Sequence, residues 1–284
     1  MANETATAAT AAAAAAKSSK PVEPDSKLKI LALHGYRQNG DGFKSKLGSL
    51  RKFINKYAEL VFVTAPHIAP PLADTEPGTE PDPTQRSWWF NKDDGTFKGT
   101  NRNGPAIGFE ESLKLVEKVW KDEGCSGLLG FSQGACFVGL LCDLSARGMT
   151  SIKPEFAVLS SGFRSGSLVH LNFYETKVQI PSLHIYGEAD EIIPKDLSMA
   201  LADTFMDPQI LTHPGGHFLP AQAAHKQTYV EFFRERLQFH LEAKEIENAT
   251  AANSIMLDDN GLAGSGSRGN GVHGGDEDDD DDSD

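Results

Sequence analysis

Apolar residues in the middle part of the chain occur in two alternating patterns. Short runs that are apolar at nearly every position predict buried strands, because a strand covered on both faces of a sheet meets no water. Such runs lie at 28–33, 60–63, 127–131, 156–159, 183–186 and 210–212. We therefore expect a sheet whose strands are spread along the whole middle part of the chain.

Between these runs, apolar residues recur with the spacing of a helix face. Steps of four, three and four residues separate Phe43, Leu47, Leu50 and Ile54, and likewise Phe109, Leu113, Val116 and Trp120. Further helices are predicted at 135–144, 193–206 and 220–241, the last with a proline in its first turn. The alternation predicts an α/β fold, with a mostly parallel central sheet and helices on both faces. In such sheets, ligands bind at the carboxyl ends of the strands.

Both ends of the chain differ in composition from this alternating part. Residues 1–26 are rich in Ala and Thr, and residues 244–284 are rich in Gly and Ser before a run of acids. Such segments bury too little apolar surface to offset the entropy of ordering them. We therefore expect two disordered tails around a single domain at 27–243. Within that domain, an insertion at 69–104 shows no regular pattern in its Pro- and Asp-rich first part.

Charge and cysteine content exclude several classes of protein. The formal net charge of the 284 residues is −13. The segment from Asp276 to Asp284 contains eight acidic residues and no basic one, so it contributes −8 of this net charge. The remaining residues are only mildly acidic, which argues against a nucleic-acid surface of clustered Lys and Arg. The three cysteines form no disulfide or zinc framework, which favours a reducing compartment such as the cytoplasm. No run of 18 apolar residues predicts a membrane span, and the first residues lack the features of a signal peptide.

The clearest chemical motif lies in a predicted turn from strand to helix. Residues 130–134 (GFSQG) have the form G-x-S-x-G, follow an apolar strand and precede an apolar helix. In a nucleophile elbow this turn exposes the serine hydroxyl above the sheet, and the glycines prevent clashes between strand and helix. We predict that Ser132 is a nucleophile. The alternative is a tight turn with an idle serine.

A nucleophilic serine needs a base, and the base needs an acceptor that orients it. In α/β-hydrolases the chain order is serine, acid and histidine. Asp190, in the turn after the fifth predicted strand, is the candidate acid, and Glu188 and Glu191 are its rivals. His217, in a glycine-rich loop after the last strand, is the candidate base, and His213 is its rival. Because all of them follow strands, we expect them at one edge of the sheet.

Two further features concern substrate binding. Acyl transfer creates a negative oxygen, which preorganised N–H groups stabilise. We assign these groups to the backbone of Gln133, directly after the serine, and of Tyr36, in the loop after the first strand. The aromatic run Trp88, Trp89 and Phe90 follows the long loop and has two interpretations: a wall of an apolar substrate pocket, or closure of one edge of the core.

Six segments of the chain, in order, are similar to those of a known family. They are LALHGYRQ at 31–38, SWWF at 87–90, GLLGFSQGA at 127–135, VLSSGF at 158–163, SLHIYGEADEIIP at 182–194 and HPGGHFLP at 213–220. Together they resemble the FSH family of serine hydrolases over about 27–239. The resemblance implies an α/β-hydrolase fold and hydrolysis of carboxylic esters, in some members with long alkyl chains. It also implies a triad of Ser132, Asp190 and His217.

The resemblance leaves two alternatives to a carboxylesterase. A fungal branch contains thioesterases, so an acyl thioesterase is one alternative, and a non-catalytic ligand-binding receptor of the same fold is another. Family members act in the cytoplasm and some also in the nucleus. We expect a small-molecule ester as partner and no nucleic acid, metal or cofactor. The sequence leaves the oligomeric state open.

Overall fold

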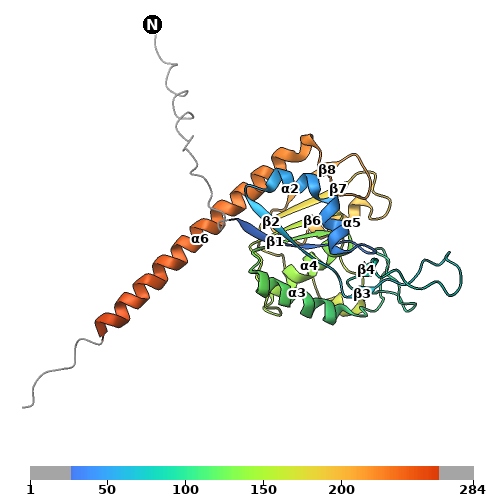
Figure 1. The fold of residues 1–284 in the computed structure, drawn as a ribbon, viewed down its shortest axis with the longest axis horizontal. Coiled ribbons are helices and arrows are strands. Elements are labelled where there is room, and N and C mark those ends of the chain that lie inside the picture. Colours follow the sequence, from blue (N-terminus) through green and yellow to red (C-terminus); the bar gives the residue numbers. More distant parts are fainter. Residues whose placement is uncertain (1–26, 262–284) are drawn as a thin grey trace, which may run out of the picture. The chain divides into compact units, whose positions relative to one another are not determined.

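The computed structural model describes residues 27–261, with side chains described as far as Ala251. A sheet with helices on both of its faces forms the domain (Figure 1). The predicted tail at 1–26 lies outside the described residues, as does the part of the other predicted tail from 262 onward. Among the described residues, no helix has the length and apolar character that crossing a membrane requires.

Six strands form one sheet in which all neighbouring strands are parallel. From edge to edge their order is β2-β1-β5-β6-β7-β8. Their bounds are Leu28–Leu33 (β1), Ala58–Val63 (β2), Gly127–Phe131 (β5), Phe156–Ser160 (β6), Ser182–Gly187 (β7) and Gln209–His213 (β8). Strands β5, β6 and β7 are buried at every position, as expected of strands that helices cover on both faces. The predicted parallel sheet is confirmed.

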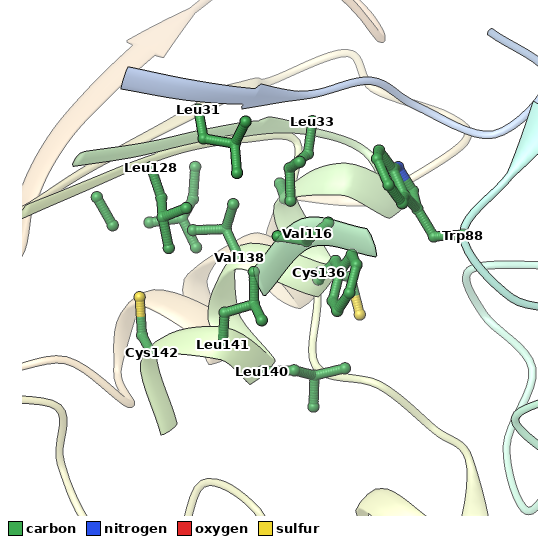
Figure 2. Close-up of a cluster of buried hydrophobic side chains, with 14 of the residues drawn as sticks. Leu31, Leu33, Trp88, Val116, Leu128, Cys136, Val138, Leu140, Leu141 and Cys142 are labelled. Carbon is green, nitrogen blue, oxygen red and sulfur yellow. The ribbon is translucent and has the colours of Figure 1, made fainter. Parts of the chain in front are cut away.

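Helices cover the two faces of this sheet in two groups. Their bounds are Gly40–Lys46 (α1), Gly48–Ile54 (α2), Phe109–Glu123 (α3), Gln133–Ala146 (α4), Lys195–Ala202 (α5) and Lys226–Gly261 (α6), with short 3₁₀ helices at Leu168–His170 and Ala223–His225. Apolar residues of α1, α2 and the first part of α6 pack in one core. Those of α3, α4 and α5 pack in the other. In that second core, Leu31, Leu33 and Leu128 of the sheet point toward α4 (Figure 2).

Two segments differ from the sequence prediction in the first half of the domain. The apolar face at 43–54 belongs to two helices, because Leu47 leaves the helical backbone region with a ψ of 14° and α2 starts at Gly48. The long loop predicted as irregular is bounded by two short antiparallel strands, β3 (His67–Ile68) and β4 (Arg86–Ser87). Their pairing closes the base of this loop.

The last helix also differs from its predicted bounds. It begins at Lys226 and runs to Gly261, whereas the apolar pattern predicted 220–241. The apolar face ends near Leu241, where the chain divides into two compact units. The residues that follow are rich in Glu and Ala, which have high intrinsic helix propensity. The first part of the predicted C-terminal tail, as far as Gly261, is therefore helical.

The aromatic run after β4 lies mainly in the core. Trp88 and Trp89 are completely buried beside α4, which favours the interpretation that they close one edge of the core. Phe90 is half-buried and does not line the cavity beside Ser132. The side-chain amide of Gln133 accepts a hydrogen bond from the Trp88 N–H (3.0 Å) and donates one to the Trp89 carbonyl (2.7 Å). Because these backbone groups are paired, the irregular segment can be buried without a large loss of hydrogen bonding.

Three histidines are buried in the neutral form. Burial lowers the pKa of His34 and of His170 to about 4, and that of His184 to about 3. The cause is the loss of hydration that a charged imidazolium would suffer in the core. His34 also accepts a hydrogen bond at Nε2 from the Ala65 N–H (3.0 Å). That bond requires the neutral ring.

We expect the free energy of unfolding to decrease as the pH falls from about 6.5 toward about 5. In this range the unfolded histidines take up protons and the folded ones do not, so each contributes up to about 1.4 kcal/mol per pH unit. Urea unfolding at several pH values measures this slope. His184→Gln removes one of the three groups and should flatten the slope. A slope that His184→Gln leaves unchanged would contradict the neutral burial of this residue.

Replacing Gln133 by alanine should destabilise the protein. Gln133→Ala leaves the Trp88 N–H unpaired in the core, whereas the Trp89 carbonyl keeps the hydrogen bond that it accepts from the Ser87 hydroxyl (2.7 Å). A buried group left unpaired costs about 1–3 kcal/mol, so we expect the free energy of unfolding to fall by roughly 1–3 kcal/mol in urea titrations. Gln227→Ala, at an exposed position of α6, is the matched control and should change it by less than about 0.5 kcal/mol. Equal effects of the two substitutions would refute the role of the Gln133 amide.

Candidate active site

Ser132 occupies the sharp turn between β5 and α4. Its backbone has φ 54° and ψ −116°, a conformation that costs energy for a residue with a side chain. A Cβ on Gly130 would lie 2.4 Å from the carbonyl oxygen of Gly134, and one on Gly134 would lie 2.1 Å from that of Leu33. The Ser132 N–H donates to the Ser160 carbonyl at the end of β6 (2.9 Å). The turn therefore needs both glycines and places Ser132 at the carboxyl edge of the sheet.

The side chains of Ser132, His217 and Asp190 form one chain of hydrogen bonds. His217 Nε2 lies 3.0 Å from Ser132 Oγ, and His217 Nδ1 lies 2.8 Å from Asp190 Oδ2. The second carboxylate oxygen, Oδ1, accepts from the N–H groups of Ile192 (3.0 Å) and Ile193 (2.8 Å). With a proton on Nδ1 donated to the carboxylate, Nε2 is free to accept the serine proton.

The loops that carry the acid and the base are packed against each other. A Cβ on Gly187, at the end of β7, would lie 2.2 Å from the carbonyl oxygen of Gly215 in the histidine loop. The His217 ring also packs on Phe131, with ring centroids 4.8 Å apart. Backbone contact and ring packing together fix the direction of the imidazole relative to Asp190.

The alternative candidates for the acid and the base do not belong to this chain of hydrogen bonds. Glu188 and Glu191 are exposed, and neither is hydrogen-bonded to His217, whose Nδ1 is taken by Asp190. His213 is buried against the ring of Phe218, and burial lowers its pKa. Within the described residues, neither ring nitrogen of His213 has a hydrogen-bond partner. Of these candidates, Asp190 and His217 are the ones that are hydrogen-bonded in line with Ser132.

Two backbone N–H groups lie beside the serine hydroxyl. Gln133 is the first residue of α4, so its N–H has no acceptor within the helix. A Cβ on Gly35 would lie 3.3 Å from Ser132 Cβ, which shows that the loop after β1 passes next to the serine. Within the described residues, the backbone bonds of this loop use the N–H groups of Gly35 and Arg37 and leave that of Tyr36 without a protein acceptor. Both predicted donors are thus available near Ser132.

A cavity of about 480 Å³, here called the Ser132 cavity, opens beside the serine. Its volume is typical of small-molecule sites. Its other lining residues are Tyr36, Phe97, Lys98, Gly99, Thr100, Phe163, Glu191, Ile192, Ile193 and Pro194. Sequence reasoning missed most of them. Phe163 follows β6 and residues 191–194 follow β7, and the ends of parallel strands are where ligand contacts are expected. Residues 97–100 lie in the insertion, which has no periodic pattern that could have indicated them.

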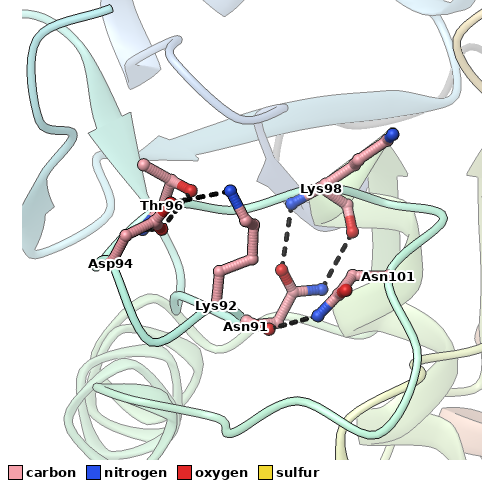
Figure 3. Close-up of polar contacts among 6 residues, drawn as sticks. All are labelled: Asn91, Lys92, Asp94, Thr96, Lys98 and Asn101. Carbon is pink, nitrogen blue, oxygen red and sulfur yellow. Dashed lines mark hydrogen bonds and ion pairs between the residues drawn. The ribbon is translucent and has the colours of Figure 1, made fainter. Parts of the chain in front are cut away.

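The segment 97–100 forms one wall of this cavity and is held by the side chain of Asn91 (Figure 3). The Asn91 amide accepts from the Lys98 N–H and donates to the Lys98 carbonyl, both at 2.9 Å. A Cβ on Gly99 would lie 2.6 Å from Ile193 Cδ1. The backbone of this wall therefore already approaches the opposite side of the cavity closely.

The whole arrangement contains the parts needed for acyl transfer. A hydroxyl is hydrogen-bonded to a base, the base is bonded to a buried carboxylate, and two N–H groups and a cavity lie next to the hydroxyl. Within the part of the chain that the structure describes, no group of three or more His, Cys, Asp and Glu side chains could hold a metal ion.

Comparisons with known proteins agree with this geometry. The family model described as serine hydrolase (FSH1) matches residues 23–229. An esterase of Aedes aegypti is 84% identical over 273 residues, which cover 96% of each chain. The esterase OVCA2 of Danio rerio is 43% identical over 222 residues, which cover 73% of this chain and 96% of that protein.

The fold has a counterpart among solved structures. The crystal structure of acyl-protein thioesterase 2 from Zea mays matches with a TM-score of 0.54 at 19% identity, over 74% of this chain and 94% of that one. At this identity the match concerns the fold alone. Together with the parallel sheet described above, it identifies an α/β-hydrolase fold. With the family model and the related esterases, it leads to one assignment: this chain belongs to the FSH1 family of serine hydrolases.

Proposed function

We propose that this protein is a serine carboxylesterase, which hydrolyses esters of alkyl or acyl-chain substrates through a covalent acyl-enzyme on Ser132. The observation that carries the proposal is the unbroken hydrogen-bond chain from Ser132 through His217 to Asp190. It lies at the edge of the sheet where ligands bind in α/β folds. The membership of the serine hydrolase family supports the same reaction class.

In the first half of the reaction, Ser132 Oγ attacks the ester carbonyl while its proton passes to His217 Nε2. The carbonyl oxygen becomes negative and accepts hydrogen bonds from the N–H groups of Tyr36 and Gln133. Such donors are preorganised, and each contributes about 3–4 kcal/mol to transition-state stabilisation. Asp190 stabilises the protonated imidazole, and its own position is held by two backbone N–H groups.

In the second half, the bond from the acyl carbon to the leaving oxygen breaks, and His217 gives its proton to that oxygen. The alcohol departs, and the acyl group remains on Ser132. Water then loses a proton to His217 as it attacks the acyl carbon, and the serine oxygen recovers a proton as the acid is released. The chain's own residues supply every proton transfer in this cycle.

The Ser132 cavity fits the apolar part of such a substrate. Phe97, Phe163 and Ile193 present aromatic and aliphatic surface, which gains free energy when it is covered by a carbon chain. Ile192 is 63% exposed at the same cavity. An acyl chain would cover surface that is otherwise in contact with water.

The thioester alternative shares every element of this site. The attack by Ser132 and the stabilisation of the oxyanion are the same whether the leaving atom is oxygen or sulfur. The receptor alternative is less well supported, because a binding protein has no need of an assembled nucleophile, base and acid. The kcat/KM values for an ester and a thioester with the same acyl chain distinguish a carboxylesterase from a thioesterase.

The state of the cysteines supports the proposed cytoplasmic location, which in some members of the family extends to the nucleus. Cys125, Cys136 and Cys142 are all free and buried. Burial raises the pKa of the Cys125 thiol to about 12 and raises the pKa of the other two as well. Thiols of this kind are unreactive structural residues, as is common in proteins of reducing compartments.

Removing any member of the triad should nearly abolish activity. We expect Ser132→Ala and His217→Ala to lower kcat by about 10⁴–10⁶-fold and Asp190→Asn by about 10⁴-fold. Because the residues act as a unit, the Ser132→Ala/His217→Ala double variant should lose no more activity than the more damaging of the two single variants.

Covalent labelling tests the nucleophile directly. Intact mass after treatment with a fluorophosphonate probe should show one adduct on the wild type and on the control Ser151→Ala, at an exposed serine. An adduct retained on Ser132→Ala would rule out the proposed nucleophile.

Filling the Ser132 cavity should change the preferred acyl chain. In Gly99→Val the new side chain meets Ile193 and Phe163, whose atoms already lie within 2.6 Å and 3.2 Å of a Cβ at this position. We expect kcat/KM for octanoate esters to fall about ten-fold or more relative to acetate esters of the same alcohol. The acetate ester is the internal reference for correct folding. An unchanged octanoate-to-acetate ratio would place the acyl chain elsewhere.

A further inference from the structure

A second cavity, of about 230 Å³, borders the proposed base. It is here called the His217 cavity, because it is lined by His217 and not by Ser132. The Ser132 cavity has the opposite arrangement, since it is lined by Ser132 and not by His217. The nucleophile and the base, 3.0 Å apart, thus face two different cavities.

We propose that the His217 cavity binds the leaving group of the substrate, and that this group is a short apolar stem that ends in an anion. This inference rests on the proposed esterase function. In that reaction the proton of Ser132 Oγ reaches the leaving oxygen through His217 Nε2. The leaving oxygen must therefore lie within hydrogen-bond distance of Nε2 when its bond to the acyl carbon breaks.

The other half of the substrate is fixed by different atoms. The acyl carbon becomes bonded to Ser132 Oγ, and its oxygen points to the N–H groups of Tyr36 and Gln133. Tyr36 lines the Ser132 cavity and is absent from the lining of the His217 cavity. The acyl chain is therefore directed into the larger cavity, and the group attached to the leaving oxygen into the smaller one.

The walls of the His217 cavity are suited to a short carbon stem. Phe43 and Leu47 come from the region of α1, Phe131 from the end of β5, and Phe218 directly follows the base. Phe218 is 44% exposed, so a stem that covers it removes apolar surface from water. At about 230 Å³ the cavity is smaller than typical sites for drug-sized ligands. It therefore suits a stem of a few carbons.

The charge around this cavity is unbalanced. Lys46, near the end of α1, and His217 are its ionisable lining residues, and no carboxylate lines it. The Ser132 cavity has Lys98 and Glu191, whose charges offset each other. A cation in an apolar lining that holds no carboxylate attracts an anion. This asymmetry points to a leaving group whose far end carries a carboxylate or a phosphate.

The first test compares two esters that differ only at the end of the alcohol. Hexanoate esters of butanol and of 4-hydroxybutyrate have the same acyl chain and the same four-carbon stem, and liquid chromatography with mass detection measures released hexanoate. We expect the wild type to favour the anionic ester by about two- to five-fold in kcat/KM, as for an exposed ion pair. Lys46→Ala should remove this preference, and Lys46→Glu should reverse it.

The matched control for these variants is Lys44→Ala. Lys44 lies on the same helix, two residues from Lys46, and does not line the His217 cavity. It should keep the preference of the wild type. A wild type without preference, or equal effects of Lys44→Ala and Lys46→Ala, would overturn the anionic leaving group.

The second test separates the two cavities with two exposed apolar residues. Phe218→Ala should lower the advantage of butyl over methyl hexanoate by about two- to ten-fold and leave the ratio of hexanoate to acetate methyl esters as it is in the wild type. Ile192→Ala, in the Ser132 cavity, should do the reverse. If both variants changed the same ratio, the assignment of the cavities would be wrong.

Ser132→Ala distinguishes failure of this inference from failure of the proposed function. Turnover of all esters by Ser132→Ala at the wild-type rate would refute the serine mechanism itself, and the assignment of the cavities with it. Turnover that depends on Ser132 but not on the length or the charge of the alcohol would refute the assignment of the cavities alone.

Discussion

Contact between two pieces of backbone at Gly134 is the constraint on which the site depends. The α-carbon of Gly134 lies so close to the carbonyl oxygens of Leu33 and His34 that no side chain fits. The first turn of α4 is therefore packed directly on the end of β1. Since β1 leads into the loop with Tyr36, this contact brings that loop beside Ser132. A wider turn would preserve the sheet and separate Ser132 from the N–H group of Tyr36, one of the two proposed oxyanion donors.

The turn after Asp190 belongs both to the hydrogen-bond chain of Ser132, His217 and Asp190 and to the lining of the Ser132 cavity. Ile192 and Ile193 donate their N–H groups to the Asp190 carboxylate, and the same two residues line the Ser132 cavity. A movement of this turn would change the shape of the cavity and the direction of His217 together. Substrate fit and orientation of the base are therefore physically coupled.

Sequence reasoning succeeded where structure is decided by nearby residues. Apolar runs marked the strands, and the glycines around Ser132 marked the elbow, because both depend on steric effects within a few residues. The choice of Asp190 over Glu188 and Glu191 needed the structure, since three acids in one turn have the same chemistry. The deciding factor was which carboxylate reaches His217 while accepting backbone N–H groups.

Other features depend on single side-chain contacts that leave no repeating pattern in the sequence, and they could not be predicted from it. An aromatic run such as Trp88 and Trp89 suits a pocket wall or a core equally well. What buries it is the amide of Gln133, some 45 residues away, which pairs with its backbone. The wall at 97–100 likewise depends on the side chain of Asn91 rather than on a repeating pattern of apolar residues.

The way in which Asn91 holds that wall has a consequence for how such enzymes diverge. Both of its hydrogen bonds go to the backbone of Lys98, so they place no demand on the side chains between residues 97 and 100. Substitutions there that do not press on Ile193 would alter what fills the cavity and leave Ser132, His217 and Asp190 in place. The insertion is thus a region in which natural or engineered substitutions can change the range of substrates while the proposed reaction stays the same.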